Sequence, residues 1–259
     1  MAIIGAILGD IAGSRWEFGR PDDLDWEHIE LFTDECFFTD DTVLTVATKY
    51  ALQNGIPYED AYYQFGNIYS NCSYGGNFVN WLSFPGREPY GSFGNGSAMR
   101  VSPVVDLTTA KDETLWEAMK SAVCTHNHPQ GIKGACVTAI CSWMAKQGAS
   151  KKEIEEYANR QYPDSEYKFP VSMSMRDLRR EYTWDVTCQT SVPVAIRCFL
   201  ESENYESFLR NVISLYCDTD TLCAIGGCIA EEYYGGTDFS NEALLKKYLD
   251  QRLYDVVIS

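Results

Sequence analysis

The sequence predicts an all-α fold in a single domain that covers residues 1–259. Apolar residues recur at helical spacing through most of the chain, as in Val43, Leu44, Val46, Ala47, Tyr50 and Ala51. Strand-like alternation of apolar and polar residues is scarce, and no unit of strand followed by helix repeats. A hydrophobic content of 45% is ample for one buried core.

Helical periodicity predicts the elements in chain order. The predicted helices are 2–13, 43–51, 58–70, 112–124, 130–147, 151–161, 190–202, 205–216, 220–234 and 241–251. Gly5, Gly9 and Gly13 are four residues apart, which places them on one face of the first helix, where another backbone can approach closely. The segment 163–189 is polar and rich in turn formers, and we expect it to be a long excursion between helices.

Composition narrows the classes of function. A formal net charge of −16 disfavours a nucleic-acid partner, because such binding depends on Lys and Arg neutralising phosphates. The first thirteen residues are apolar, but they lack a basic start and contain Asp10, unlike a signal peptide. No apolar run is long enough to span a bilayer. The ten cysteines include no C-x-x-C pair, and we expect them to be reduced and mostly small core residues. We therefore expect a cytoplasmic protein with no membrane partner.

The stretch "FFTDDTVLT" at 37–45 places Thr39, Asp40 and Asp41 directly before an amphipathic helix. One interpretation is a helix N-cap, since Thr or Asp can accept the free N–H groups and acids suit the positive end of a helix. Capping does not require the second acid, which is therefore available for another role.

The stretch "DTDT" at 218–221 repeats this pattern before a second apolar helix, with Asp218, Asp220 and Thr221. An EF-hand is excluded, because Leu222 and Cys223 occupy positions where that loop needs an oxygen ligand and a glycine. A capped helix is one remaining interpretation. The other is that the two helix starts meet at one cation site, where four carboxylates and two Thr hydroxyls hold two Mg²⁺, or Mn²⁺, ions.

Histidine and glycine supply two further signals. The chain has only three histidines, which disfavours a structural zinc site, so any metal should be held by oxygen. The loop "GSFGNGSAM" at 91–99 fits an anion site, because glycines let backbone N–H groups turn toward a phosphate, although such loops are also ordinary turns. His126 lies at a helix entrance, where it is either structural or part of a site.

Together these motifs resemble the ADP-ribosylglycohydrolase family. The resemblance covers nearly the whole chain, through "GAILGDIAGSRWEF", "FTDDTVLT", "SYGG", "GSFGNGSAMRVSP", "THNHPQGIKGA" and "DTDTLCAI" in that order. It implies a compact orthogonal bundle of helices with a binuclear magnesium site in a cleft. By motif, the implied metal ligands are Thr39, Asp40, Asp41, Asp218, Asp220 and Thr221.

The resemblance also implies the substrate contacts. Glu17 matches a glutamate beside the metals and is the expected residue for handling the proton or the water, assisted by Asp40 or Asp218. The implied ADP-ribose contacts are Ser73, Tyr74, Gly75, Gly76, Gly91, Ser92, Phe93, Gly94, Asn95, Gly96, Ser97, Ala98, Met99 and His126. Phe93 is the candidate for aromatic contact with the nucleotide. Where the family often has two glycines before D-[ST]-D-T, this chain has Tyr216 and Cys217, which could narrow the site.

The implied function is Mg²⁺-dependent hydrolysis of the bond between ADP-ribose and a modified arginine or serine, which releases ADP-ribose. Its partner would be an ADP-ribosylated protein or a small ADP-ribosyl substrate. A non-catalytic ADP-ribose reader is one alternative. The other is a haloacid-dehalogenase-like phosphatase with Asp218 as nucleophile, which the helical pattern before Asp218 and the 38 residues after Thr221 both disfavour.

Overall fold

The computed structural model describes residues 1–259, and its regular elements are all helices, with no strand and one isolated antiparallel bridge between Gly94 and Thr187. Its elements are α1 (Ala2–Gly13), η1 (Ser14–Trp16), α2 (Asp40–Asn54), α3 (Tyr58–Ile68), α4 (Gly76–Ser83), α5 (Gly96–Met99), α6 (Ser102–Leu107), α7 (Lys111–Val123), α8 (Pro129–Lys146), α9 (Lys151–Gln161), α10 (Met175–Glu181), α11 (Cys188–Leu200), α12 (Tyr205–Ile213), α13 (Thr219–Tyr234), α14 (Asn241–Tyr248) and α15 (Gln251–Ile258). The predicted all-α class is confirmed.

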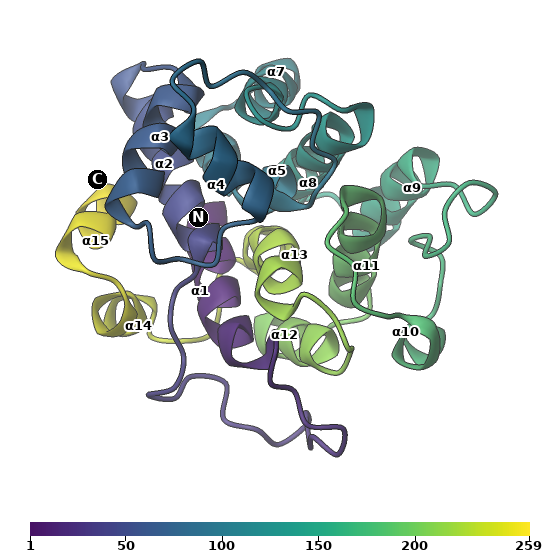
Figure 1. Cartoon of the computed structure of the whole chain (residues 1–259). Coiled ribbons are helices and arrows are strands. Elements are labelled where there is room, and N and C mark those ends of the chain that lie inside the picture. The colour runs from purple at the N-terminus through teal and green to yellow at the C-terminus, as the bar shows by residue number, and fades with distance from the viewer.

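Helix α13 lies at the centre of the molecule (Figure 1). It packs against α1, α8, α11 and α12, so that helices from both ends of the sequence surround it. Helices α2, α3, α4 and α7 cover one side of this centre, and α9, α10 and α11 another (Figure 1). The buried apolar side chains form a single contiguous core of 67 residues. No helix is both long and apolar enough to cross a membrane.

The glycine face of α1 makes the closest approach between helices. A Cβ atom built on Gly9 would lie 2.3 Å from the carbonyl oxygen of Cys223, and one on Gly13 would lie 2.6 Å from the Cα of Asp220. Gly5 makes an equally close approach farther along α13. The predicted close backbone contact on this face is confirmed. It also sets the start of α13, where Asp220 lies, directly against α1.

The structure differs from the predicted elements in three respects. The short helices α4, α5 and α6 were not predicted. The predicted helix 241–251 ends at Tyr248 as α14, because Leu249 is extended. A separate helix, α15, begins at Gln251 and runs to Ile258, beyond the predicted range, and Asp250 caps it by accepting a hydrogen bond of 3.0 Å from the N–H of Leu253. The segment 163–189 is not a bare excursion, since it contains α10 and buries Phe169 and Val171 in the core. All ten cysteines are unpaired, as expected.

Candidate active site

The start of α2 is organised around Asp10, a carboxylate on α1 that is fully buried. Its Oδ1 accepts a hydrogen bond of 2.8 Å from the Thr39 hydroxyl, and its Oδ2 accepts from the N–H groups of Thr39 and Thr42 at 3.0 and 3.1 Å. The Thr42 hydroxyl also donates to Oδ2. Thr39 caps α2 by accepting a bond of 3.2 Å from the N–H of Asp41. These bonds fix the Thr39–Asp41 segment against α1.

The start of α13 meets the start of α2. The Thr221 hydroxyl donates to Oδ2 of Asp41 at 3.2 Å, across 180 residues of sequence. Asp218 precedes the first residue of α13, and its Oδ2 accepts a hydrogen bond of 2.7 Å from the side-chain amide of Asn95. The structure therefore brings the two acid clusters together, as the repeated pattern led us to expect.

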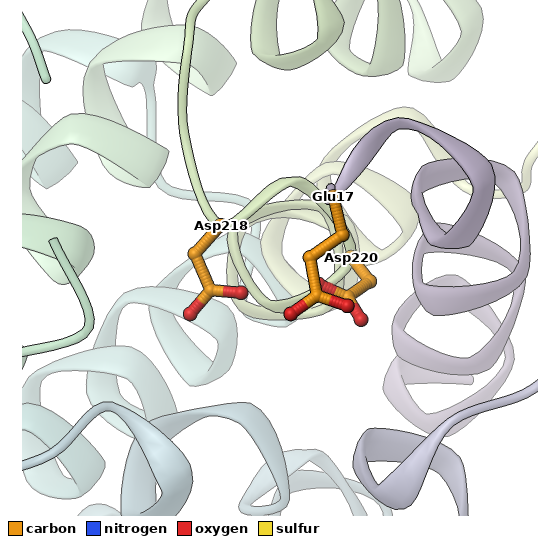
Figure 2. A group of neighbouring side chains, drawn as sticks. All are labelled: Glu17, Asp218 and Asp220. Atoms are coloured by element: carbon orange, nitrogen blue, oxygen red, sulfur yellow. The ribbon is translucent and has the colours of Figure 1, made fainter. Parts of the chain in front are cut away.

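Glu17 joins the cluster from the chain just after η1. Figure 2 shows its carboxylate beside those of Asp218 and Asp220, all three on the same side of the start of α13. One oxygen from each of the three lies within 4.8 Å of the other two, a spacing at which one cation could contact all of them. Burial, followed by repulsion from Asp218, raises the pKa of Glu17 to about 7.

The carboxylates of this cluster destabilise one another in the absence of a cation. Burial raises the pKa values of Asp40, Asp41 and Asp220 well above the usual range, and repulsion between neighbouring carboxylates adds to the effect. Oδ1 of Asp41 is buried without any hydrogen-bond partner. An acceptor-only set with an unused buried oxygen has the chemistry of a site for a hard divalent cation. The residues present therefore fit a metal.

The cluster lies in a cavity of about 530 Å³. Its lining includes most of the residues expected at the site: Glu17, Asp40, Asp41, Asp218, Asp220, Thr221, Ser73, Gly75, Gly76, Gly91, Ser92, Phe93, Gly94, Asn95, Gly96, Met99 and His126. A larger cavity of about 870 Å³, between the end of α2 and α7, is lined by both acidic and basic side chains, and its acids do not converge as Glu17, Asp218 and Asp220 do.

Four residues expected at the site lie behind the cavity wall. Tyr74 packs on Phe78 with ring centroids 5.2 Å apart, and Ala98 is a core residue. The Ser97 hydroxyl donates to the carbonyl oxygen of Gly131 at 2.7 Å. Thr39 is 2% exposed; its hydroxyl donates to Asp10 and accepts from the N–H of Asp41, which leaves one lone pair of the oxygen free.

The glycine-rich loop is held in place by the end of the 163–189 segment. The N–H of Asn95 donates to the carbonyl of Val186 at 2.8 Å, and the N–H of Cys188 donates to the carbonyl of Phe93 at 2.9 Å. Val186 and Thr187 also line the cavity. This segment had no predicted role, because nothing in its composition indicates which loop it pairs with.

Two aromatic rings lie beside the glycine-rich loop at the rim of the cavity. Phe93 is 44% exposed, and its ring lies 5.1 Å from that of His128. An exposed ring at the rim of a cavity is available to stack on a flat ligand group. His126 lies deeper, at 5% exposure, and lines the cavity beneath the glycines.

Neither residue of the Tyr216–Cys217 pair narrows the cavity. Tyr216 is exposed to solvent, and the buried Cys217 thiol faces the carbonyl of Val212 and the Thr219 hydroxyl. Neither side chain is part of the lining. This departure from the family pattern therefore places no side chain in the cavity.

Asp10 is the main residue of the site that sequence analysis missed. Its signal was present, since a carboxylate in the middle of an apolar helix must find partners when buried. We used it only as an argument against a signal peptide. Asn77, Tyr90 and Arg100 also line the cavity without having been predicted.

Comparisons with known proteins show the family of the chain. A family model described as ADP-ribosylglycohydrolase matches residues 1–256. The chain is 26% identical to the human protein "ADP-ribosylhydrolase ARH3", across 90% of this chain and 84% of that protein. It is 23% identical to the ARH3 of Xenopus tropicalis, across 90% of this chain and 86% of that protein.

A solved structure shares the fold. A chain from an "ADP-ribosylglycohydrolase-related protein complex" superposes with a TM-score of 0.73 and 21% identity, covering 99% of this chain and 94% of that one. The match of the family model over almost the entire length, together with the helical fold, settles the family. The chain belongs to the ADP-ribosylglycohydrolase family, a group of hydrolases that cleave the glycosidic bond of ADP-ribose.

Proposed function

We propose that the protein catalyses Mg²⁺-dependent hydrolysis of the bond between ADP-ribose and a modified side chain, an arginine N-glycoside or a serine O-glycoside, and releases ADP-ribose. The observation that carries this proposal is the meeting of the α2 and α13 starts beside Glu17, inside a cavity walled by a glycine-rich loop. The substrate is an ADP-ribosylated protein or a small ADP-ribosyl compound.

The acid cluster would hold two Mg²⁺ ions, or Mn²⁺ in their place. The proposed ligands are Thr39, Asp40, Asp41, Asp218, Asp220 and Thr221, which supply only oxygen, the ligand type that both ions prefer. When bound, these ions would neutralise the buried carboxylates and polarise hydroxyl groups of the substrate ribose or a water. Support for a metal comes from the unpartnered Asp41 oxygen and from the raised pKa values of Asp41 and of its neighbours Asp40 and Asp220.

The remaining residues bind and orient the substrate. Some backbone N–H groups of the loop and the turn have no partner in the protein and would bind an anionic group such as the pyrophosphate. They are those of Ser92, Phe93 and Gly96 in the loop and of Ser73, Gly75 and Gly76 in the turn, whereas the N–H groups of Gly91, Gly94 and Asn95 donate within the protein. Phe93 contacts the flat face of the adenine. Cleavage of the glycosidic bond builds positive charge at the anomeric carbon, which the carboxylates of Asp40 and Asp218 stabilise. Hydrolysis removes a proton from the attacking water and adds one to the leaving group. Glu17, beside Asp218, would accept or donate that proton.

The structure argues against the phosphatase alternative. That motif needs its aspartate at the end of a strand, whereas Asp218 follows α12 and opens α13, and the chain has no strand. A non-catalytic reader would use the same cavity, so only the release assay described below distinguishes it from a hydrolase. The ten unpaired cysteines favour a reducing compartment, and we propose the cytoplasm.

A release assay tests the proposal. The protein is incubated with ADP-ribosyl-arginine and ADP-ribosyl-serine peptides, with Mg²⁺ or EDTA, and free ADP-ribose is quantified. We expect Mg²⁺-dependent release from one of the two peptides, which identifies the linkage. Asp218→Asn should lose roughly 100-fold or more of this activity, whereas the exposed Asp112→Asn on α7 should not. Tight binding of ADP-ribose without release from either peptide would identify a reader instead.

A further inference from the structure

Arg100 is a buried cation without an anionic partner. It follows α5 directly, it is 0% exposed, and it makes no ion pair. Its guanidinium carbon lies 4.1 Å from the ring centroid of Tyr62, and its Nε and Nη1 have no hydrogen-bond partner. Burying an unpaired charge is costly, so its position calls for an explanation beyond packing. Arg100 also lines the cavity that holds the acid cluster.

The one short hydrogen bond that Arg100 makes leads to His126. Its Nη2 lies 2.7 Å from the Thr125 hydroxyl oxygen, which in turn lies 2.7 Å from Nδ1 of His126. Arginine can only donate, so the Thr125 oxygen accepts from it. The hydroxyl proton of Thr125 has no acceptor other than Nδ1 among the hydrogen bonds of the structure. Nδ1 therefore accepts, and the ring proton resides on Nε2.

The free side of the His126 ring faces the glycine-rich loop. A Cβ atom built on Gly96 would lie 3.2 Å from Nε2, and one on Gly94 would lie 3.7 Å from it. Nε2 makes no hydrogen bond within the protein, although the ring is only 5% exposed. Burial, followed by the positive charge of Arg100, holds the pKa of His126 well below its usual range, so the ring is neutral. The Nε2–H of His126 is therefore a donor without a partner, located where the glycine-rich loop lines the cavity.

We infer that Arg100 and Thr125 are positioning residues that fix His126 as an Nε2–H donor to a phosphate oxygen of the bound ligand. This inference rests on the proposed function, in which the cavity holds ADP-ribose. The guanidinium orients the Thr125 hydroxyl, the hydroxyl sets the tautomer, and the tautomer decides whether His126 offers a donor or a lone pair to an anion. The wrong tautomer would place a lone pair against a negatively charged oxygen.

Nuclear magnetic resonance can read the tautomer directly. Two-bond nitrogen–proton spectra distinguish Nδ1–H from Nε2–H imidazole, and His28→Gln and His128→Gln assign the remaining signal, since the chain has three histidines. The test variants are Thr125→Val, which removes the hydroxyl, Thr125→Ser, which restores it, and Arg100→Lys. Thr138→Val is the matched control, because Thr138 is equally buried and its hydroxyl has no partner.

We expect wild-type His126 to be the Nε2–H tautomer without ligand, and Thr125→Val to lose that tautomer. The same variant should bind ADP-ribose about tenfold more weakly, the loss expected for one hydrogen bond to a charged group, with binding of adenosine, which has no phosphate, unchanged. Thr125→Ser and Thr138→Val should behave as the wild type. Arg100→Lys should give a mixture of tautomers. Circular dichroism checks that each variant is folded.

The outcomes separate this inference from the proposed function. A wild-type Nδ1–H signal would show that Arg100 and Thr125 do not set the tautomer of His126, even if ADP-ribose binds. An unchanged tautomer and affinity in Thr125→Val would show the same. We call this proposed effect of Arg100 and Thr125 on His126 the relay. Failure of the wild type to bind ADP-ribose overturns the proposed function and the phosphate contact together, whatever the spectra show. Loss of tautomer and affinity in Thr125→Val with recovery in Thr125→Ser supports the relay, since a merely structural role would not follow the hydroxyl.

Discussion

Adding a single methyl group at the contact between α1 and α13 should destabilise the protein and disturb the active site. In Gly9→Ala, the new Cβ would lie 2.3 Å from the carbonyl oxygen of Cys223, about 1 Å inside the normal contact distance. The obstacle is helix backbone, which cannot rotate away as a side chain can. Because the obstacle cannot move, we expect an overpacking cost at the upper end of the usual range, about 3 kcal/mol, and the better helix propensity of alanine returns about 1 kcal/mol. The expected net loss is about 2 kcal/mol in the free energy of unfolding.

The same displacement should reduce activity. Asp218 and Asp220 open α13, and Asp10 on α1 holds the start of α2, so separating the two helices by about 1 Å moves the acid clusters apart. Misplacement on that scale costs roughly 100-fold in rate. Thermal denaturation should show a Tm lower by about 4–8 °C, and the release assay should show the loss of activity at a temperature where the variant is folded.

Gly86→Ala is the control, because nothing lies within 4 Å of the Cβ built there. It should change the free energy of unfolding by less than about 0.5 kcal/mol. If Gly9→Ala were as stable and as active as Gly86→Ala, the close packing of α1 on α13 would not hold the site, and the reasoning would fail.

Four further predictions concern the site itself. Asp220→Asn should raise the Tm measured in EDTA, because it removes one buried charge from the cluster, and should abolish the increase in Tm on adding Mg²⁺; a lower Tm in EDTA would contradict the electrostatic account. Asp10→Asn replaces a side chain that accepts four hydrogen bonds. It should weaken Mg²⁺ binding, measured by calorimetry, roughly 10- to 100-fold. Unchanged affinity would show that Asp10 does not position the metal ligands. Phe93→Ala should weaken ADP-ribose binding about tenfold, because the stacking contact with the adenine is lost. Equal affinity would show that the adenine does not bind at Phe93. In EDTA, stability should fall as pH rises from about 4.5 to about 7, because the folded-state pKa of Glu17 is about 7 and the folded state binds more protons there; stability that rises across this range in urea titrations would refute the shift.

The long helices were predictable because their apolar faces repeat over several turns. The face of Gly5, Gly9 and Gly13 was predictable for a related reason, since glycines at a spacing of four have little use on an exposed helix. The short helices α4, α6 and α10 were missed, because one or two turns contain too few residues to establish a period. The break between α14 and α15 depends on a single cap at Asp250, which composition does not reveal.

The acid clusters were predictable at the level of residue type. Two oxygen-rich helix starts with more acids than capping requires indicated a shared site, and the Thr221–Asp41 hydrogen bond joins them. Which side chains of the glycine-rich loop face the cavity was not predictable. Residues 96–99 form the turn α5, so consecutive side chains point in different directions, and Ser97 and Ala98 face the core. The network of Asp10 depends on tertiary contacts between α1 and α2 that no local pattern encodes.

The central claim is that the two helix starts form one metal-dependent catalytic site for cleavage of ADP-ribose. The measurement that tests it most directly is the rate of ADP-ribose release from ADP-ribosyl-arginine and ADP-ribosyl-serine peptides, as Mg²⁺ is titrated into metal-free wild-type protein and into Asp41→Asn and Asp220→Asn, one variant from each helix start. We predict a saturable, Mg²⁺-dependent rate in the wild type and loss of that rate in both variants. A rate that is independent of Mg²⁺, or that survives either substitution, would contradict the account.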